Sequence, residues 1–232
     1  MMHTSPAPIR CDPNLVHGER HSRPVSTADL VLSSLPTSIC KRFRRNAEVF
    51  GQGDSAEYLY AVRTGAVRSY KLLEDGRRQI GSFYFPGDIF GIEAGLNHQF
   101  STDAIVDSDI VLVKWSAAHA IAAHDLQFVY KLWIVTAQQL KQAQEHLVLL
   151  GRKNARERVA TFLVEMVRRR GLVGNAVELP MSRQDIADYL GLTIETVCRV
   201  LSSFKRDGVI DIPNAHRIEL RNRAALAEIG EG

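Results

Sequence analysis

The sequence predicts an α+β fold in which an N-terminal double-stranded β-helix jelly roll is followed by a long helix and a winged helix-turn-helix. Three observations predict it. Short segments of period two, separated by turns that contain glycine, fill the chain from Ala47 to Trp115. Apolar residues in heptad spacing run from Val129 to Leu150. A helix, a tight turn and a second helix are then indicated between Ser182 and Leu201.

Length, composition and charge agree with a globular chain of several parts. The 232 residues are 45% apolar and include no run long enough to span a membrane. The cysteines Cys11, Cys40 and Cys198 are scattered and odd in number, which favours the cytoplasm over a disulfide framework. Residues 1–150 carry 15 basic and 15 acidic residues and residues 151–232 carry 14 and 11, so the net charge of +3 lies in the C-terminal part.

Four parts are expected along the chain. The first is a mobile tail, because Pro, Ser, His and Arg mix there without an apolar period. A helix is predicted at 27–45 from the apolar residues Leu30, Val31 and Leu35. The parts are the tail at 1–26, the jelly roll at 27–123, the long helix at 124–151 and the winged helix-turn-helix domain at 152–232.

Alternating apolar and polar residues predict the strands of the jelly roll. Leu59, Ala61 and Val67 alternate with polar neighbours, and residues 80–83 and 110–113 are also strand-like. No His-x-His pattern or carboxylate cluster lies within these strands, so no metal site is predicted. No nucleophile with an adjacent base is visible either, and we do not expect an enzyme.

The long helix carries an apolar seam with steps of 4, 3, 4, 3, 4 and 3 residues. The seam predicts a homodimer through the same helix of a second subunit; the alternative is a helix buried wholly within one chain. A second stripe, formed by Leu126, Tyr130, Ile134 and Ala137, is expected to pack on the jelly roll, and Gly151 to end the helix. The predicted dimerisation residues are Val129, Trp133, Thr136, Leu140, Ala143, Leu147 and Leu150.

The helix-turn-helix follows a predicted amphipathic helix at 152–170. Ser182 is expected to cap its first helix, and Gly191 to allow the sharp turn. Thr193 is expected to cap the second helix, which buries Val197 and Leu201. Segments 209–212 and 217–220 alternate and predict a two-stranded wing.

The side of the second helix opposite its apolar face suits base edges in the major groove of DNA. An Arg can bind guanine, a Glu can accept from cytosine N4, and apolar atoms can contact thymine methyls. The alternative is a packed helical hairpin with an i,i+4 ion pair. The predicted base contacts are Ile194, Glu195, Cys198 and Arg199. The predicted phosphate contacts, at the helix starts, are Ser182, Arg183, Gln184, Thr193 and Thr196.

Jelly roll, seam helix and winged helix-turn-helix in this order resemble the CRP/FNR family of bacterial transcription regulators, over about residues 28–225. The most specific motifs are Arg183 to Gly191, Glu195-Thr196-Val197-Cys198-Arg199 and the turn Phe85 to Gly91. The resemblance implies a homodimer that binds double-stranded DNA, contacts RNA polymerase and acts mainly as an activator. CRP-type readers have Arg where this chain has Ile194. The apolar residue, Glu and later Arg instead resemble the FNR and FixK branches, which imply TTGAT-type half-sites.

The same comparison addresses cofactors. Cyclic-nucleotide binders hold the phosphate with an Arg-Ser pair, but Phe100 precedes Ser101 here, so cAMP is not expected. Iron–sulfur members resembling FNR need four cysteines, and this chain has three. No cofactor is therefore expected, and the resemblance favours the FixK branch, which implies genes for nitrogen fixation or low-oxygen respiration. The alternative is a sensor whose jelly roll binds an unidentified effector.

Two further hypotheses concern exposed side chains. Cys198 is a redox candidate, because its oxidation would place a bulky anion on the DNA-facing side; the alternative is a plain small contact residue. Arg77 and Arg78, in a charged turn between two strands, are candidates for a polymerase contact by resemblance to an activating loop of the FNR branch; the alternative is an ordinary solvated hairpin.

Overall fold

The computed structural model of the chain describes residues 38–93 and 95–231. The tail predicted at 1–26, with Cys11, lies outside the described residues, as does most of the helix predicted at 27–45. The described end of that helix is a strand instead: β1 (Ile39–Phe43) pairs antiparallel with β8 (Ser108–Lys114). Hydrogen bonding to β8 and burial of the Phe43 ring outweigh a weak helical pattern.

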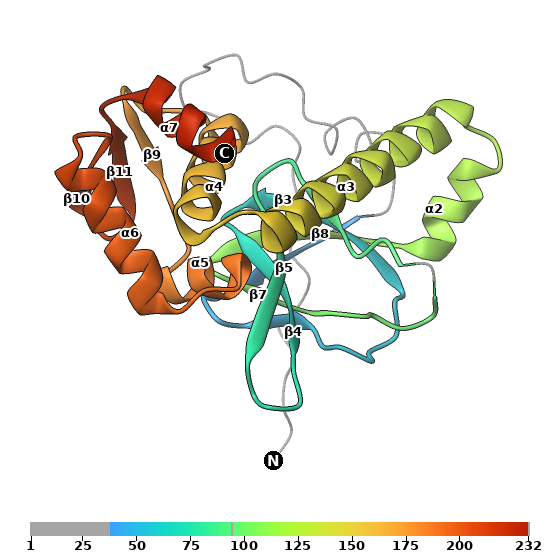
Figure 1. The fold of residues 1–232 in the computed structure, drawn as a ribbon. Helices are drawn as coiled ribbons and strands as arrows, with labels where there is room; N and C mark the ends of the chain where they lie inside the picture. Colours follow the sequence, from blue (N-terminus) through green and yellow to red (C-terminus); the bar gives the residue numbers. More distant parts are fainter. Residues whose placement is uncertain (1–37, 94, 232) are drawn as a thin grey trace. The chain divides into compact units, whose positions relative to one another are not determined.

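Two four-stranded sheets form the jelly roll that the sequence predicts. One sheet has the strand order β1-β8-β3-β6 and the other β2-β7-β4-β5. The order of the elements along the chain can be followed in Figure 1. The remaining strands are β2 (Glu48–Phe50), β3 (Tyr58–Thr64), β4 (Val67–Leu72), β5 (Arg78–Tyr84), β6 (Ile89–Phe90) and β7 (Ser101–Ala104).

Strand β3 is buried on both faces and takes part in two cores. Because successive side chains of a strand point to opposite faces, Tyr60 and Val62 join the core inside the jelly roll, whereas Leu59 and Ala61 join a second core. Helical residues complete this second core: Ala118, Phe128 and Val135. The helices that follow β8 are thus attached to the jelly roll through β3 and its neighbours.

These helices are α2 (Trp115–Ala122) and α3 (Leu126–Arg152). Asp125 begins α3, since its Oδ1 accepts hydrogen bonds from the backbone N–H of Gln127 at 2.9 Å and of Phe128 at 3.1 Å. Gly151, predicted to end the helix, lies within it, because a single glycine costs only about 1 kcal/mol in a helix.

The face of α3 that packs on the jelly roll differs from the predicted stripe. Leu126 and Tyr130 are exposed, whereas Phe128 and Val135 are buried and Leu132 packs against the same core. Phe128, Leu132 and Val135 also follow 4–3 spacing, but the sequence analysis did not single them out, and the predicted packing stripe was wrong at Leu126 and Tyr130.

The C-terminal part begins with α4 (Ala155–Arg170). A capping box starts it: Asn154 Oδ1 accepts from Glu157 N at 3.1 Å, and Glu157 Oε2 accepts from Asn154 N at 3.0 Å. Helices α5 (Arg183–Leu190) and α6 (Ile194–Arg206) form the helix-turn-helix. Helix α7 (Arg223–Glu231), which the sequence analysis does not anticipate, packs against α4.

The wing has three strands rather than the predicted two. Strands β10 (Ile210–Asn214) and β11 (Arg217–Leu220) match the prediction, and β9 (Ala176–Glu178) adds to them in the order β10-β11-β9. Pro213 lies in the edge strand β10, where a missing N–H is tolerated. Strand β9 is too short to show a period of its own.

The chain divides into two compact units. One holds most of the jelly roll and α3 as far as Gln139; the other holds the chain from Leu140 together with Tyr70–Ser82, which includes the loop between β4 and β5. Among the described residues, no helix combines the length and the apolar character that crossing a membrane requires.

Candidate nucleic-acid interface

Local hydrogen bonds position the two helices of the helix-turn-helix. Ser182 caps α5 by accepting from Asp185 N at 3.1 Å, and Asp185 Oδ2 accepts from Ser182 N at 2.9 Å. Gly191 ends α5 with φ of 61°, a left-handed conformation that favours glycine. Thr193 Oγ1 accepts from Thr196 N at 3.2 Å and so begins α6.

An apolar core holds α6 against the other helices. Val197, Leu201 and Phe204 of α6 are buried, as are Ile186 and Leu190 of α5. Contacts join α6 to both α5 and α4. Burying these side chains leaves the opposite side of α6 to solvent, because an amphipathic helix buries only one stripe.

The exposed side of α6 carries most of the predicted base contacts. Glu195, Cys198 and Arg199 are exposed, and Ile194 is half-buried. Hydrogen bonds from its own backbone N–H and from Thr193 hold the pKa of Glu195 below its ordinary value, so this carboxylate is an acceptor at neutral pH. Ser202 is exposed one turn beyond Cys198 and Arg199; helical spacing alone could have added it to the predicted set.

The predicted phosphate contacts differ in how far their side chains are already engaged. Ser182 is committed to its cap, and Gln184 Nε2 donates to Asp188 Oδ1 at 2.6 Å. The hydroxyl oxygens of Thr193 and Thr196 are 3.1 Å apart. Arg183 is half-buried, and its buried Nη1 has no hydrogen-bond partner within the described part of the chain. Burial lowers the pKa of Arg183, and the charge interaction with Cys198 opposes that shift.

Arg158 was not anticipated from the sequence and supports the turn before α6. Its Nη1 donates to Leu190 O at 2.9 Å, its Nε to Lys153 O at 2.8 Å and its Nη2 to Leu150 O at 2.9 Å. One guanidinium therefore satisfies carbonyls at the end of α5 and at the junction of α3 with α4. The sequence gives no signal for its bond to Leu190 O, because that carbonyl lies 32 residues further along the chain.

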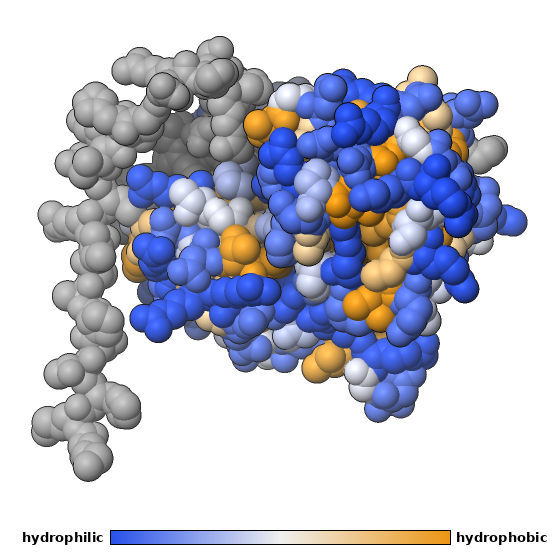
Figure 2. Space-filling model, turned by 90° about the vertical axis from the view of Figure 1, so that its left-hand side faces the viewer, coloured by the Kyte–Doolittle hydropathy of each residue, from blue (hydrophilic) through white to orange (hydrophobic). Residues whose placement is uncertain are grey.

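The surface that includes the winged domain is mostly hydrophilic. Figure 2 views the molecule from the side on which α6, β10 and β11 lie in Figure 1, and shows hydrophilic residues with smaller hydrophobic patches between them. At the end of α6, Lys205 Nζ lies 2.9 Å from Asp211 Oδ1. This contact and those with Arg221 lower the pKa of Asp211 to about 2 and tie the wing to α6.

The predicted dimerisation seam is largely exposed in the single chain. The exposed fractions are 61% for Trp133, 60% for Leu140 and 71% for Leu147. Val129, Thr136 and Ala143 are exposed as well, and Leu150 is half-buried. Leu126 lies seven residues before Trp133 and extends the seam by one step.

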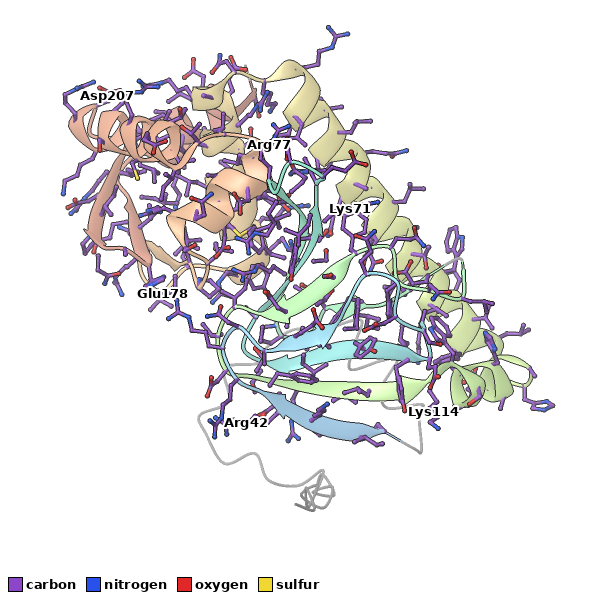
Figure 3. All side chains as sticks on the ribbon, turned by 90° about the horizontal axis from the view of Figure 1, so that it is seen from below. Arg42, Lys71, Arg77, Lys114, Glu178 and Asp207 are labelled. Atoms are coloured by element: carbon purple, nitrogen blue, oxygen red, sulfur yellow. The ribbon has the colours of Figure 1, made fainter. Side chains whose placement is uncertain are left out.

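The two candidate polymerase contacts lie at the loop between β4 and β5, where Figure 3 labels Arg77. Arg77 is exposed and its Nε donates to Asp75 Oδ2 at 2.7 Å in the same loop. Arg78 begins β5 and is bound to carboxylates of α5. The two arginines, which the sequence analysis treated as one candidate contact, therefore have different binding partners in the structure.

A cavity of about 330 Å³ lies in the jelly roll, and Phe100, Glu93 and Thr102 are among the residues that line it. No Lys or Arg is among its described lining residues, and the Glu93 carboxylate would repel a phosphate. These residues do not fit a cyclic nucleotide. Elsewhere, no group of three or more His, Cys, Asp or Glu among the described residues could hold a metal ion.

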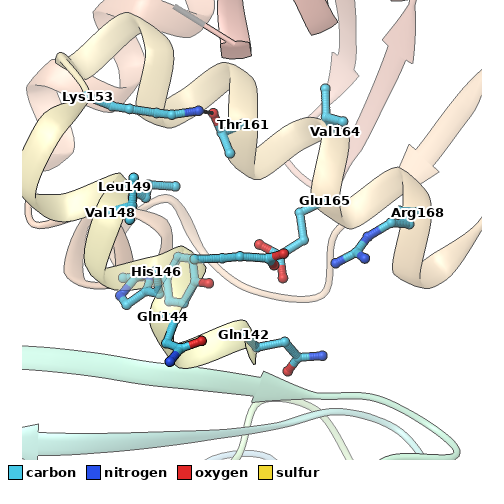
Figure 4. Close-up of a pocket in the computed structure, with 12 residues that line it drawn as sticks. Gln142, Gln144, His146, Val148, Leu149, Lys153, Thr161, Val164, Glu165 and Arg168 are labelled. Atoms are coloured by element: carbon cyan, nitrogen blue, oxygen red, sulfur yellow. Dashed lines mark hydrogen bonds between the residues drawn. The ribbon is translucent and has the colours of Figure 1, made fainter. Parts of the chain in front are cut away.

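A second cavity, of about 470 Å³, lies between α3 and α4 (Figure 4). His146, Val148 and Leu149 come from α3, and Thr161 and Glu165 from α4. The His146 ring stacks on Tyr189 with 4.2 Å between centroids, and neither ring nitrogen has a hydrogen-bond partner among residues 38–93 and 95–231. Burial lowers the pKa of His146 to about 4, so the imidazole is neutral at pH 7.

Comparisons with known proteins agree with this geometry. The family model described as "Crp-like helix-turn-helix domain" matches residues 157–229, and the "Cyclic nucleotide-binding domain" model matches residues 40–124. The chain is 47% identical over 191 residues to "Nitrogen fixation regulation protein FixK" of Azorhizobium caulinodans, which covers 81% of this chain and 77% of that protein. It is 42% identical over 188 residues to the protein of the same name from Rhizobium meliloti, covering 81% and 85%.

A solved structure extends the likeness to the fold. FixK2 from Bradyrhizobium japonicum has a TM-score of 0.80 and 50% sequence identity, covering 83% of this chain and 97% of that one. The fold and the relatives thus confirm the expected family of transcription regulators, which are not enzymes. The chain belongs to the CRP/FNR family of DNA-binding transcription regulators, and within it to the FixK type.

Proposed function

We propose that this protein is a cytoplasmic homodimer that binds TTGAT-type palindromes and, mainly as an activator, controls genes for nitrogen fixation or low-oxygen respiration. The observation that carries the proposal is the exposed group of Glu195, Cys198 and Arg199 on the capped helix α6. Relatives named for nitrogen fixation regulation support the choice of genes. An ionised Glu and an Arg one helical turn apart supply an acceptor and a bidentate donor for neighbouring base pairs.

The proposed dimer rests on the exposed seam of α3. Exposed Trp, Leu and Val side chains at heptad spacing are unfavourable in water, and pairing with the same helix of a second subunit removes them from it. A two-fold dimer then places two α6 helices about 34 Å apart, one turn of DNA. The two-fold symmetry of such a dimer predicts that its DNA site is a palindrome.

Binding of a labelled TTGAT-type palindrome tests the proposal directly. Purified protein without any added ligand should saturate it, with an affinity at least about 10³-fold above that for a scrambled duplex at the same salt concentration. Measurements with and without reductant report on Cys198 at the same time. Equal affinity for both duplexes would refute the proposed sequence specificity.

Activation is proposed to use Arg77, which is exposed on its loop. The Arg77→Glu variant should bind the palindrome like the wild type but fail to activate transcription in vitro, because it reverses the charge offered to polymerase and, besides the local ion pair with Asp75, removes no proposed DNA contact. Full activation by this variant would identify the loop as an ordinary solvated hairpin.

A second candidate function is ligand sensing by the jelly roll. The cavity of about 330 Å³ favours it, and its lining suits an uncharged ligand rather than an anionic one. In that case the ligand-free protein should not saturate the palindrome, whereas the leading proposal requires that it does.

A further inference from the structure

Arg77 and Arg78 are neighbours with different surroundings. The Arg77 side chain is 78% exposed, and among the described residues it bonds only within its own loop, to Asp75. The Arg78 side chain is 23% exposed and reaches two carboxylates of α5. Its Nε donates to Asp188 Oδ2 at 2.8 Å and its Nη2 donates to Asp185 Oδ1 at 2.7 Å. All these residues belong to the same compact unit.

Other contacts hold the same cluster. The guanidinium carbon of Arg78 lies 5.5 Å from the centre of the Tyr70 ring, a cation–π arrangement. The next residue, Gln79, donates from Nε2 to Tyr189 O at 3.2 Å, near the C-terminal end of α5. Two successive residues of β5 therefore bind α5 near its first turn and near its last.

Asp185 links this cluster to the start of the helix-turn-helix. It is 3% exposed, and its Oδ2 accepts from both the backbone N–H and the hydroxyl of Ser182, at 2.9 and 2.8 Å. Its Oδ1 accepts from Arg78. A carboxylate at such low exposure requires a nearby cation or several donors, and Arg78 supplies the cation.

We propose that Arg78 is a positioning residue for DNA recognition, which neutralises Asp185 and Asp188 and thereby holds α5, and α6 packed on it, in the arrangement that presents Arg199 and its neighbours to bases. This inference rests on the proposed function. It assigns the two arginines separate roles: Arg77 is available to another protein, and Arg78 acts inside the DNA-binding unit.

The physical effect of removing Arg78 follows from the carboxylates that it joins. Without the guanidinium, Asp185 and Asp188 are two poorly hydrated like charges that previously shared one cation. Asp185 relieves this by turning toward water, which breaks its bonds to Ser182 and loosens the first turn of α5. No DNA contact is lost directly, so the number of neutralised phosphates stays the same.

DNA binding by Arg78→Ala, with Arg77→Ala as the matched control, tests the role. Arg78→Ala should lower affinity for the palindrome by about tenfold or more and reduce the ratio to scrambled DNA, with an unchanged salt slope. Arg77→Ala should match the wild type. If Arg78→Ala instead lost affinity equally for the palindrome and the scrambled duplex, and its salt slope fell by about one, Arg78 would contact a phosphate directly and the proposal would be overturned.

Hydrogen exchange in the DNA-free protein separates this inference from the proposed function. Backbone amides of Arg183–Leu190 should exchange faster in Arg78→Ala than in Arg77→Ala. Arg78→Lys keeps the positive charge but loses the planar guanidinium that binds two carboxylates, so its exchange rates should lie between those of the other two variants. If Arg78→Ala does not fold, Arg78→Lys against wild type gives the same comparison. Equal amide exchange rates in these variants would overturn the positioning role of Arg78. Failure of the wild type to bind the palindrome would refute only the proposed function.

Discussion

On the exposed side of α6, three residues with different chemistry occupy one turn of helix. Glu195 is an ionised acceptor, Arg199 a permanent donor and Cys198 an exposed thiol. Arg183 itself is half-buried at the start of α5, and no described residue bonds its Nη1. Base specificity and backbone affinity are therefore expected from different arginines.

Replacing these two arginines should separate the two effects. Arg199→Ala should cost about 1–3 kcal/mol of binding free energy on the palindrome and relax the preference at one guanine, because a bidentate contact is lost. Arg183→Ala should weaken all sequences alike and reduce the salt slope by about one unit, because a phosphate contact is lost. Titrations against base-substituted duplexes at several salt concentrations measure both. A change in base preference from Arg183→Ala alone would reverse the assignment.

Oxidation should inactivate DNA binding through Cys198. Peroxide converts an exposed thiol to sulfinate or sulfonate, which adds a bulky anion to the surface that we propose faces DNA phosphates. Wild type should lose affinity steeply, and Cys198→Ser should bind DNA and resist. Cys40→Ser, which changes the half-buried cysteine of β1, is the matched control and should remain sensitive. Equal peroxide sensitivity of Cys198→Ser and the wild type would place the sensitive group elsewhere.

At the scale of elements, α3 is a helix with two apolar faces. Phe128, Leu132 and Val135 attach it to the jelly roll, while Trp133, Leu140 and Leu147 are exposed. These exposed positions are seven residues apart and form a straight row. A surface of this kind on a globular protein usually marks an interface.

Charges placed on that row should prevent dimerisation. Leu140→Asp combined with Leu147→Asp should yield monomers and abolish palindrome binding, because burial of two aspartates per helix costs more than the seam provides. Sedimentation velocity and gel shift measure the two effects. Gln138→Asp, an exposed change on the same helix outside the seam, should leave the dimer intact. Dimers that survive the double substitution would exclude this interface.

At the scale of the whole molecule, a buried histidine in the cavity between α3 and α4 makes the free energy of unfolding depend on pH. His146 has a folded-state pKa of about 4, below the ordinary 6.5, because burial disfavours its charged form. The unfolded chain therefore binds the extra proton first, and this contribution to stability is lost as pH falls from about 6.5 to about 4. Glu165 on α4 contributes to stability in the opposite direction. Burial raises its pKa, so its contribution to the free energy of unfolding is lost as pH rises.

The variant His146→Gln isolates the histidine. Its thermal midpoint should fall less steeply than that of the wild type between pH 6.5 and 4, and the two curves should run parallel above pH 7. Glu145 and Glu165, together with Arg168, line the same cavity and are common to both proteins, so the difference reports His146. Curves that stay parallel throughout would show that His146 titrates normally.

Local patterns in the sequence determined much of this protein. Turn residues and period two identified the jelly roll, heptad spacing identified the seam, and the Ser182 cap, Gly191 and Thr193 delimited the helix-turn-helix, because each feature depends on residues close together in the chain. Charge and spacing on α6 were enough to select the exposed group of Glu195, Cys198 and Arg199.

Only the tertiary structure decided features that depend on distant residues. Strand β1 exists because β8 pairs with it, and Phe128 rather than Leu126 faces the jelly roll because β3 offers a core there. Arg78 meets Asp185 across 107 positions, and Arg158 meets Leu190 O across 32. Such contacts leave no periodic trace in the sequence, since hydrogen bonds and burial depend on three-dimensional proximity. That is why two adjacent arginines with identical chemistry have different surroundings in the folded protein.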